Sequence, residues 1–171
     1  MIRATPLALL ASAALADPAH AQLDPVEGSC SLVSGPMVRV NVAGLSDRTG
    51  RLKVEIYPPT EADFLRDDTG LKRARRPFRR VWMNIPASGP VAVCIRAPHA
   101  GQWAVLLTHD RDGKNKFNFW QDGAGFPSNQ RLGRNRPSVR QALLNVPAQG
   151  GQITVRLQYL RGLGGFGPMD D

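Results

Sequence analysis

The stretch Gly101–Asp110, which reads GQWAVLLTHD, decides the fold. Alternate residues of an extended strand point to opposite faces of its sheet, and here both faces are largely apolar. The two sets are Trp103, Val105 and Leu107 on one face and Ala104, Leu106 and Thr108 on the other. A strand that is apolar on both faces is covered on both sides, so this stretch is predicted to be central in a sheet.

The rest of the chain shows the same alternation of apolar and polar residues and little helical periodicity. Further strands are predicted around residues 38–42, 52–56, 81–85, 91–95, 142–146 and 153–159. Thr60 precedes acidic residues, a helix-start pattern that predicts one short helical turn through Phe64 and Leu65. Together these elements predict an all-β fold, a single β-sandwich of about seven strands.

Residues 1–21 have the pattern of a secretory signal peptide. Arg3 precedes an apolar span, and Ala19-His20-Ala21 supplies the small residues of a cleavage site. We therefore expect a periplasmic or secreted protein. No later apolar run reaches the ~18 residues that a membrane-spanning helix needs, so no transmembrane segment is expected.

The remaining chain has the usual length of one domain. Residues 22–37 are interpreted as an N-terminal lead-in, and residues 38–160 as the β-sandwich domain. Residues 161–171 read RGLGGFGPMDD, and their glycine content predicts a flexible tail.

The chain contains two cysteines, Cys30 and Cys94. In an oxidising compartment a lone pair is most simply a disulfide, so we predict that these two are bonded. A reactive thiol is the alternative, but the chain has no Cys-x-x-Cys motif.

The formal charge is +8, and the basic residues are clustered. The densest group is a basic patch that consists of Lys72, Arg73, Arg75, Arg76, Arg79 and Arg80. Such a cluster attracts envelope polyanions, lipopolysaccharide among them, but it is also typical of a solvated loop. Nucleic acid is not an expected partner, because the chain is predicted to be exported and its basic runs lack the interleaved aromatic residues that stack on bases.

A polar run, HDRDGKNKFNFWQDGAGFPSN, begins at the end of the central strand. An acidic and amide-rich turn in that place presents side-chain oxygens at one rim of a β fold, where ligands and partners are met. The candidate binding rim consists of His109, Asp110, Asp112, Asn118, Trp120 and Asn129.

The alternating oxygens of this run suggest a calcium loop, for which Asp110 and Asp112 are the candidate ligands. The next ligand position holds Lys114, however, and Asn115 replaces the glycine of the sharp turn, so the run is not an EF-hand. The lysines also reduce the local negative charge. We therefore expect no metal and no other cofactor, and we predict that both aspartates accept hydrogen bonds from the backbone of their own turn.

The neighbouring pair His109 and Asp110 suggests general-base catalysis, and hence a hydrolase. A catalytic constellation needs a third group, and the chain has neither a Gly-x-Ser-x-Gly motif nor a cysteine with the signs of a nucleophile. We therefore assign no catalytic residue, and we predict that a backbone carbonyl satisfies His109.

Three stretches of the chain resemble a known family: VRVNVAGLSDRTGRLKVEIYPPTEADFL, GQWAVLLTHDRDGKNKFNFW and GAGFPSNQRLGRNRPSVRQALLNV. From about Val38 to Tyr159 the chain is similar to the exported bacterial family named domain of unknown function 2141 (DUF2141). The usual family loop reads like His-Asp-x-Asn-x-Asn-Gly-Lys-x-Asp, and this chain departs from it at Lys114, Asn115 and Asn118. The resemblance implies a compact envelope β-sandwich, transthyretin-like or immunoglobulin-like, and it brings no agreed activity.

Three functional hypotheses follow. The leading one is a non-enzymatic envelope module whose rim meets a partner protein or a glycan. The second is an anion binder that uses the arginine-rich segments. The third is a hydrolase centred on His109 and Asp110, which requires a concave pocket with a nucleophile within hydrogen-bond reach.

Overall fold

The computed structural model describes Gly28, Cys30 and residues 35–169. The predicted signal peptide and most of the predicted lead-in lie outside these residues. The strands in the described part are β1 (Met37–Ala43), β2 (Arg51–Tyr57), β3 (Arg79–Asn84), β4 (Ala92–Arg96), β5 (Gly101–Asp110), β6 (Gly123–Gly125), β7 (Leu143–Val146), β8 (Gly151–Arg156), β9 (Gln158–Leu160) and β10 (Phe166–Pro168). The helices are α1 (Asp68–Arg73), α2 (Val139–Ala142) and the 3₁₀ turn η1 (Gly162–Gly164).

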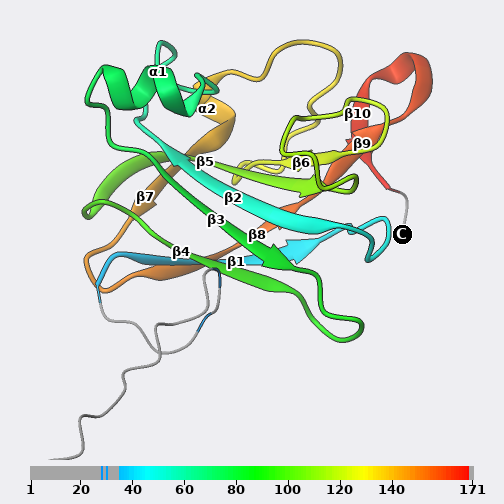
Figure 1. Cartoon of the computed structure of the whole chain (residues 1–171), viewed down its shortest axis with the longest axis horizontal. Coiled ribbons are helices and arrows are strands. Elements are labelled where there is room, and N and C mark those ends of the chain that lie inside the picture. The colour runs from blue at the N-terminus through cyan, green and yellow to red at the C-terminus, as the bar shows by residue number, and fades with distance from the viewer. Residues whose placement is uncertain (1–27, 29, 31–34, 170–171) are drawn as a thin grey trace, which may run out of the picture.

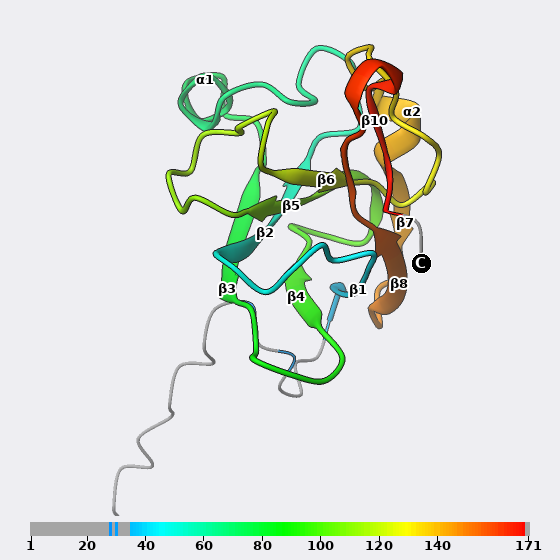
Figure 2. The ribbon, with the colours of Figure 1, turned by 90° about the vertical axis from the view of Figure 1, so that its right-hand side faces the viewer.

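These strands form two sheets. The smaller has three strands in the order β4-β1-β8, and the larger has seven, in the order β10-β9-β6-β5-β2-β3 with β7 also paired to β5. Figures 1 and 2 show the smaller sheet against one face of the larger sheet and both α-helices on the opposite face. Sandwich architecture and all-β class are therefore as the sequence predicts.

The main core lies between the sheets. Val40 of β1, Val54 of β2 and Val105 of β5 are fully buried there. A second apolar cluster lies on the outer face of the larger sheet, where Leu106 packs with Phe64 and with residues of both helices. The larger sheet is thus covered on both faces, and β5 pairs with β2, β6 and β7. The prediction of a central, doubly buried strand at Gly101–Asp110 is confirmed.

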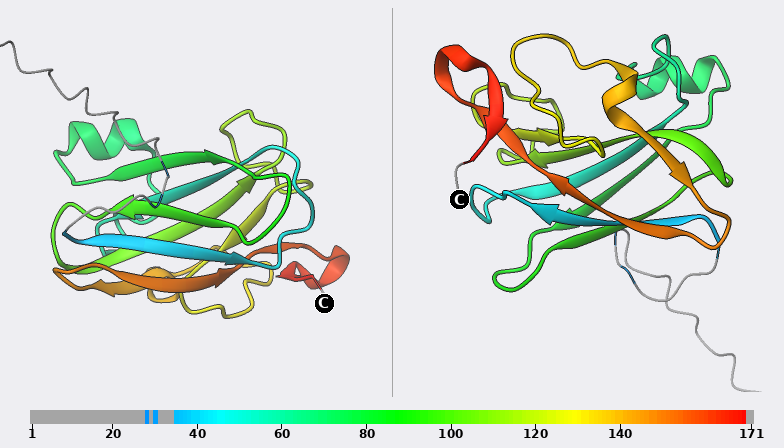
Figure 3. Two further views of the ribbon diagram at one scale, coloured as in Figure 1. Left: turned by 90° about the horizontal axis from the view of Figure 1, so that it is seen from below. Right: turned by 180° about the vertical axis from the view of Figure 1, so that it is seen from behind.

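The structure has more strands than the predicted seven, for two reasons. The predicted strand at residues 153–159 divides at Leu157, where the chain leaves the smaller sheet as β8 and continues in the larger sheet as β9. Figure 3 shows this passage in its right-hand view. The strands β6 and β10 were missed because they are short and glycine-containing, so their side chains carry no alternating pattern.

The predicted helical turn through Phe64 and Leu65 is present as one hydrogen-bonded turn, and α1 is a separate helix that follows it. The Phe64 amide donates to the Thr60 carbonyl at 2.9 Å, but α1 begins only at Asp68. Its N-cap is Asp67, whose carboxylate accepts a hydrogen bond from Gly70 N at 2.7 Å. Thr60 starts the predicted turn, where its Oγ1 accepts from Asp63 N at 3.3 Å, and Asp67 caps a helix that the sequence pattern did not indicate.

In the tail, which the sequence predicts to be flexible from residue 161, the structure has η1 and strand β10. Strand β10 pairs with β9, and Phe166 and Gly133 exchange two backbone hydrogen bonds, of 2.7 and 2.9 Å. The Phe166 ring is also buried, so a single aromatic anchor outweighs the glycines on either side of it.

The predicted disulfide between Cys30 and Cys94 is confirmed. It joins the segment before β1 to β4, which is an edge strand of the smaller sheet. Among the residues described, no helix has the length and apolar character needed to cross a membrane.

Candidate functional site

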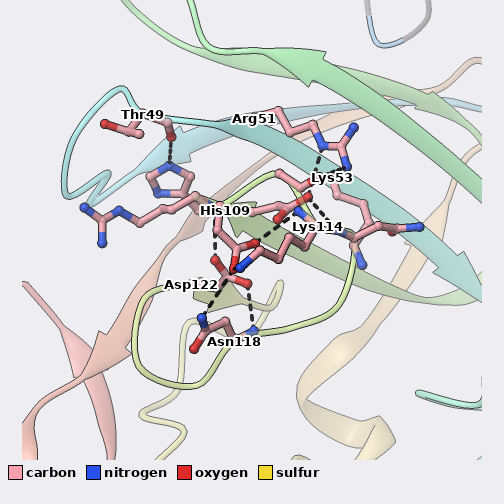
Figure 4. A network of polar contacts seen from close by, with 12 residues as sticks. Thr49, Arg51, Lys53, His109, Lys114, Asn118 and Asp122 are labelled. Atoms are coloured by element: carbon pink, nitrogen blue, oxygen red, sulfur yellow. Dashed lines mark hydrogen bonds and ion pairs between the residues drawn. The ribbon is translucent and has the colours of Figure 1, made fainter.

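His109, at the end of β5, is completely buried and has both ring nitrogens bonded. Its Nε2 donates to the Thr49 carbonyl at 2.7 Å, because a carbonyl oxygen can only accept. Figure 4 shows the bond to Thr49. Nδ1 is then the acceptor for the Tyr159 hydroxyl, at 2.8 Å, and the hydroxyl oxygen accepts from Ser46 N at 3.2 Å. Burial lowers the pKa of His109 and favours this neutral form. The predicted backbone carbonyl partner is confirmed, and the imidazole has no nitrogen left for a substrate.

Asp110 anchors β5 to β2. Its Oδ2 accepts from Arg51 Nε at 3.0 Å and from Asn115 N at 3.3 Å. The same guanidinium donates to the Gly113 carbonyl at 2.9 Å and stacks on the Trp82 ring, 3.9 Å from its centroid. Oδ1 of Asp110 is buried and has no hydrogen-bond partner among the described residues.

Asp112 closes the tip of the loop between β5 and β6, residues 111–122, which we call the rim loop. Its Oδ1 accepts from Lys114 N at 3.1 Å, and its Oδ2 lies 3.4 Å from both Lys114 Nζ and Asn118 Nδ2. The bond from the Lys114 amide lowers the pKa of Asp112. Both aspartates thus accept hydrogen bonds from the turn that follows them, as predicted.

Asp122 is the residue of the rim loop that sequence reasoning missed. It is 1% exposed, and its two carboxylate oxygens accept from Arg111 N at 2.9 Å and Asn118 N at 2.8 Å. It therefore ties the start, the middle and the end of the loop together. The only local signal is an acidic residue directly before β6, and β6 itself has no recognisable pattern.

The remaining rim residues lie in different surroundings. Trp120 is 84% exposed, and its backbone amide donates to Asn118 Oδ1 at 3.1 Å. Asn129 is not part of this cluster, because its side-chain amide bonds the backbone of β8, at Thr154 O and Arg156 N, with distances of 2.9 and 2.7 Å. The predicted rim is thus one polar cluster with an exposed indole beside it, and Asn129 fastens a separate loop to the smaller sheet.

The basic patch is not one solvated loop. Arg76 Nη2 lies 2.9 Å from the carboxylate of Asp63, whose side chain is 3% exposed. Arg80 Nε and Nη2 each lie 2.7 Å from Oε1 of the buried Glu55. The other members are exposed: Lys72, Arg73, Arg75 and Arg79. Arg76 and Arg80, two of the predicted surface cations, therefore neutralise buried carboxylates. The sequence pattern does not indicate these ion pairs.

A pocket of about 910 Å³ lies over the outer face of the larger sheet. We call it the outer pocket. Its floor includes Lys53, Glu55, Tyr57, Leu106, Thr108 and Ala124. Its apolar walls include Leu65, Phe117, Phe119, Phe126, Leu132 and Phe166. Figure 1 shows α1, the loop before α2 and the tail around β10 on this same side of the sheet.

The walls are held by contacts between distant segments. The rings of Phe117 and Phe119, from the rim loop, lie 5.8 and 6.1 Å from the Phe166 ring of the tail. The buried side chain of Gln158 accepts from Leu132 N at 2.9 Å and donates to Gln130 O at 2.7 Å. These contacts fix three loops around one cavity, so the pocket is preformed.

The floor carries a compact charged group. Oε2 of Glu55 lies 3.3 Å from Lys53 Nζ, and Oε1 receives the guanidinium of Arg80. Burial, and next the negative charge of Glu55, raise the pKa of the neighbouring Tyr57 hydroxyl. The tyrosine therefore stays protonated, and Glu55 has its charge matched by two cations.

The lining of the outer pocket is cationic in balance. It contains six basic residues, which are Lys53, Arg66, Arg80, Lys116, Arg134 and Arg136, and two acidic ones, Glu55 and Asp67. Both acids are engaged, Glu55 by the floor cations and Asp67 as the cap of α1. Arg66, Lys116 and Arg134 are exposed, and in the part of the chain that the structure describes none of the three forms an ion pair. An excess of positive charge therefore stands at the mouth of an apolar cavity.

The sequence profile of the uncharacterised proteins conserved in bacteria (DUF2141) matches residues 40–154, about two thirds of the chain. The chain therefore belongs to this family. Comparisons with curated proteins and with solved structures give no match.

Proposed function

We propose that this DUF2141 protein is an exported binding module whose outer pocket holds an amphipathic anion, a small molecule with an apolar body and one acidic group. The observation that carries the proposal is the pairing of an apolar cavity with unmatched cations at its mouth. Binding sites for small molecules are concave and mostly apolar, with a few polar groups that fix orientation, and this cavity has the usual size of such sites.

The charges favour an anion over a neutral ligand. The side chains of Arg66, Lys116 and Arg134 are long and exposed, and an acidic group at the mouth would give them a partner. Meanwhile an apolar chain would cover the half-buried Phe117 and the exposed Phe119, which line the wall. This interpretation retains the anion-binding hypothesis but moves its site from the basic patch to the pocket.

The test is a fluorescence titration of the mature protein with a dansyl-labelled long-chain fatty acid and with its methyl ester. The acid should bind about tenfold or more tightly than the ester, a difference of ~1.4 kcal/mol. In the double variant Arg66→Ser, Arg134→Ser, the affinity for the acid should fall to the affinity for the ester. Arg73→Ser is the matched control, because Arg73 is exposed but does not line the pocket. Failure of both probes to bind would contradict the proposal.

Export is supported by the N-terminal residues 1–21, whose pattern is that of a signal peptide. The mature chain is expected to begin at Gln22. Intact-mass measurement of the protein secreted by an expressing bacterium tests this, and a mass that includes residues 1–21 would contradict it.

A second candidate function is contact of the rim loop with a glycan. Phe119 and Trp120 are 64% and 84% exposed, and exposed aromatic residues at a loop tip stack on sugar rings. Retention of the wild-type protein on isolated cell-wall glycan, lost in Trp120→Ala, would support it. Equal retention of the two proteins would argue against it.

A further inference from the structure

Three carboxylates converge inside the rim loop. Asp110 ends β5, Asp112 lies at the loop tip and Asp122 directly precedes β6. Each offers a carboxylate oxygen, and these atoms all lie within 4.8 Å of one another. Figure 4 shows Asp122 in one network with Arg51, Lys114 and Asn118.

One carboxylate oxygen of these three residues is buried and has no hydrogen-bond partner among the described residues. Oδ1 of Asp110 is buried, the residue is 2% exposed, and no hydrogen bond reaches this atom from the described residues. A buried carboxylate oxygen normally has a donor or a cation beside it, because its desolvation is otherwise uncompensated. The atom is therefore an independent sign that something else binds here.

The nearby cations do not balance the cluster. Arg51 is bound to Oδ2 of Asp110 and to the Gly113 carbonyl, which leaves Oδ1 free. Lys114 Nζ lies 3.4 Å from Asp112 Oδ2, but the lysine side chain is 76% exposed and can move into solvent. Among the described residues, one guanidinium and one exposed ammonium are thus ion-paired with these three carboxylates.

We propose that Asp110, Asp112 and Asp122 bind one hard divalent cation, and that calcium is the physiological ion. The donors are all oxygen atoms, which suits calcium, whereas imidazole or thiolate donors would favour zinc or copper. Calcium–oxygen distances are about 2.4 Å, so ligand oxygens on opposite sides of the ion lie about 4.8 Å apart. The spacing of the three carboxylates in this chain fits within that limit. Water completes the coordination shell.

This site differs from the calcium loop that the sequence argues against. That loop had two carboxylates and a lysine at the next ligand position. Asp122 comes from the far end of the loop and supplies the third carboxylate, and Lys114, which pairs with Asp112, does so from an exposed side chain. The sequence expectation of no metal rested on local spacing and on the lysines of the loop, and it did not count Asp122.

In the experiment, CaCl₂ and MgCl₂ are titrated into the mature protein after a chelator has removed bound metal. The heat of binding is measured by calorimetry, and the melting temperature is measured at each metal concentration. Calcium should bind at one site with a dissociation constant of about 0.1–1 mM, the range of extracellular calcium modules, and should raise the melting temperature. Asp112→Asn should weaken binding at least about tenfold while it keeps the hydrogen bond from Lys114 N. Lys114→Ala should tighten it, because it removes a competing cation.

Asp67→Asn is the matched control, since it removes one carboxylate but retains a helix cap at α1, and it should bind calcium as the wild type does. The proposal is overturned if the wild type shows neither saturable binding nor a melting shift up to about 10 mM calcium. It is also overturned if the Lys114→Ala variant binds calcium and the wild type does not, because the Lys114 ammonium would then take the place of a metal ion in the wild type. Binding that Asp112→Asn leaves unchanged would place calcium elsewhere and overturn it as well.

Discussion

Asp122 and His109 are buried polar residues whose hydrogen bonds hold the rim loop and the end of β5 in place. Asp122 bonds two amides of the loop, and His109 joins β5 to the Thr49 turn and to β9. The sequence indicated the turn bonds of Asp110 and Asp112 because both residues open a turn-rich run. It did not indicate Arg51 or Tyr159, the distant partners of Asp110 and His109. It did not indicate Asp122, because its partners lie four and eleven residues away and depend on how the loop closes.

Asp122→Ala should destabilise the protein by about 1–3 kcal/mol, because it leaves two amide donors without partners. Asp112→Ala should cost less than about 1 kcal/mol, since Asp112 lies closer to solvent. Urea unfolding in the presence of a chelator measures both values without any contribution from metal. A smaller loss for Asp122→Ala than for Asp112→Ala would contradict the structural role given to Asp122.

The lowered pKa of His109 makes stability depend on pH. Burial keeps the folded imidazole neutral, while the unfolded chain takes up a proton near pH ~6.5. The contribution of His109 is therefore complete above about pH 6.5 and is lost as the pH falls from there toward the lowered pKa. Unfolding curves between about pH 8 and pH 5 should show a steeper acid loss for the wild type than for His109→Gln. Parallel curves would show that His109 does not titrate on unfolding.

At the level of elements, alternation of side chains predicted the long strands and the central place of β5, because these are properties of single segments. The short strands β6 and β10 depend on distant partners: Ala124 pairs with Gln158, and Phe166 with Gly133. The outer pocket was beyond prediction for the same reason, since its lining comes from segments far apart in the chain. One local signal of this outer face was present in the sequence, because Lys53, Glu55 and Tyr57 alternate with apolar residues along β2.

The basic patch yields a prediction at this scale. Arg76→Ser should cost about 1–2 kcal/mol, because Asp63 is buried and loses its guanidinium partner, although half-exposure of the arginine limits the effect. Arg73→Ser should change stability by less than about 0.5 kcal/mol, as expected for an exposed side chain. Thermal unfolding of the two variants compares them directly, and equal stabilities would restore the interpretation of a uniformly solvated loop.

At the scale of the whole molecule, the disulfide and the second apolar cluster stabilise parts of the fold that lie outside the core between the sheets. The Cys30–Cys94 bond closes a loop with a sequence separation of 64 residues. In the chain-entropy account a loop of this length contributes about 4 kcal/mol. Urea unfolding with and without reductant should show a loss of this order. Free thiols in the unreduced protein would refute the bond.

The outer pocket is also a property of the whole molecule, because strand faces, the rim loop and the tail must all be in place to form it. Burial of an apolar chain there would give binding a negative heat-capacity change. Ala124, on the pocket floor, offers a way to fill the cavity from within: Ala124→Trp adds a large ring without changing a charge.

Calorimetric titration of a long-chain carboxylate into the wild type and into folded Ala124→Trp, at several temperatures, tests pocket binding most directly. The wild type should bind one molecule with a negative heat-capacity change, and Ala124→Trp should lose binding. Absence of binding by the wild type, or equal binding by both proteins, would contradict the assignment of the outer pocket as the site of an amphipathic anion.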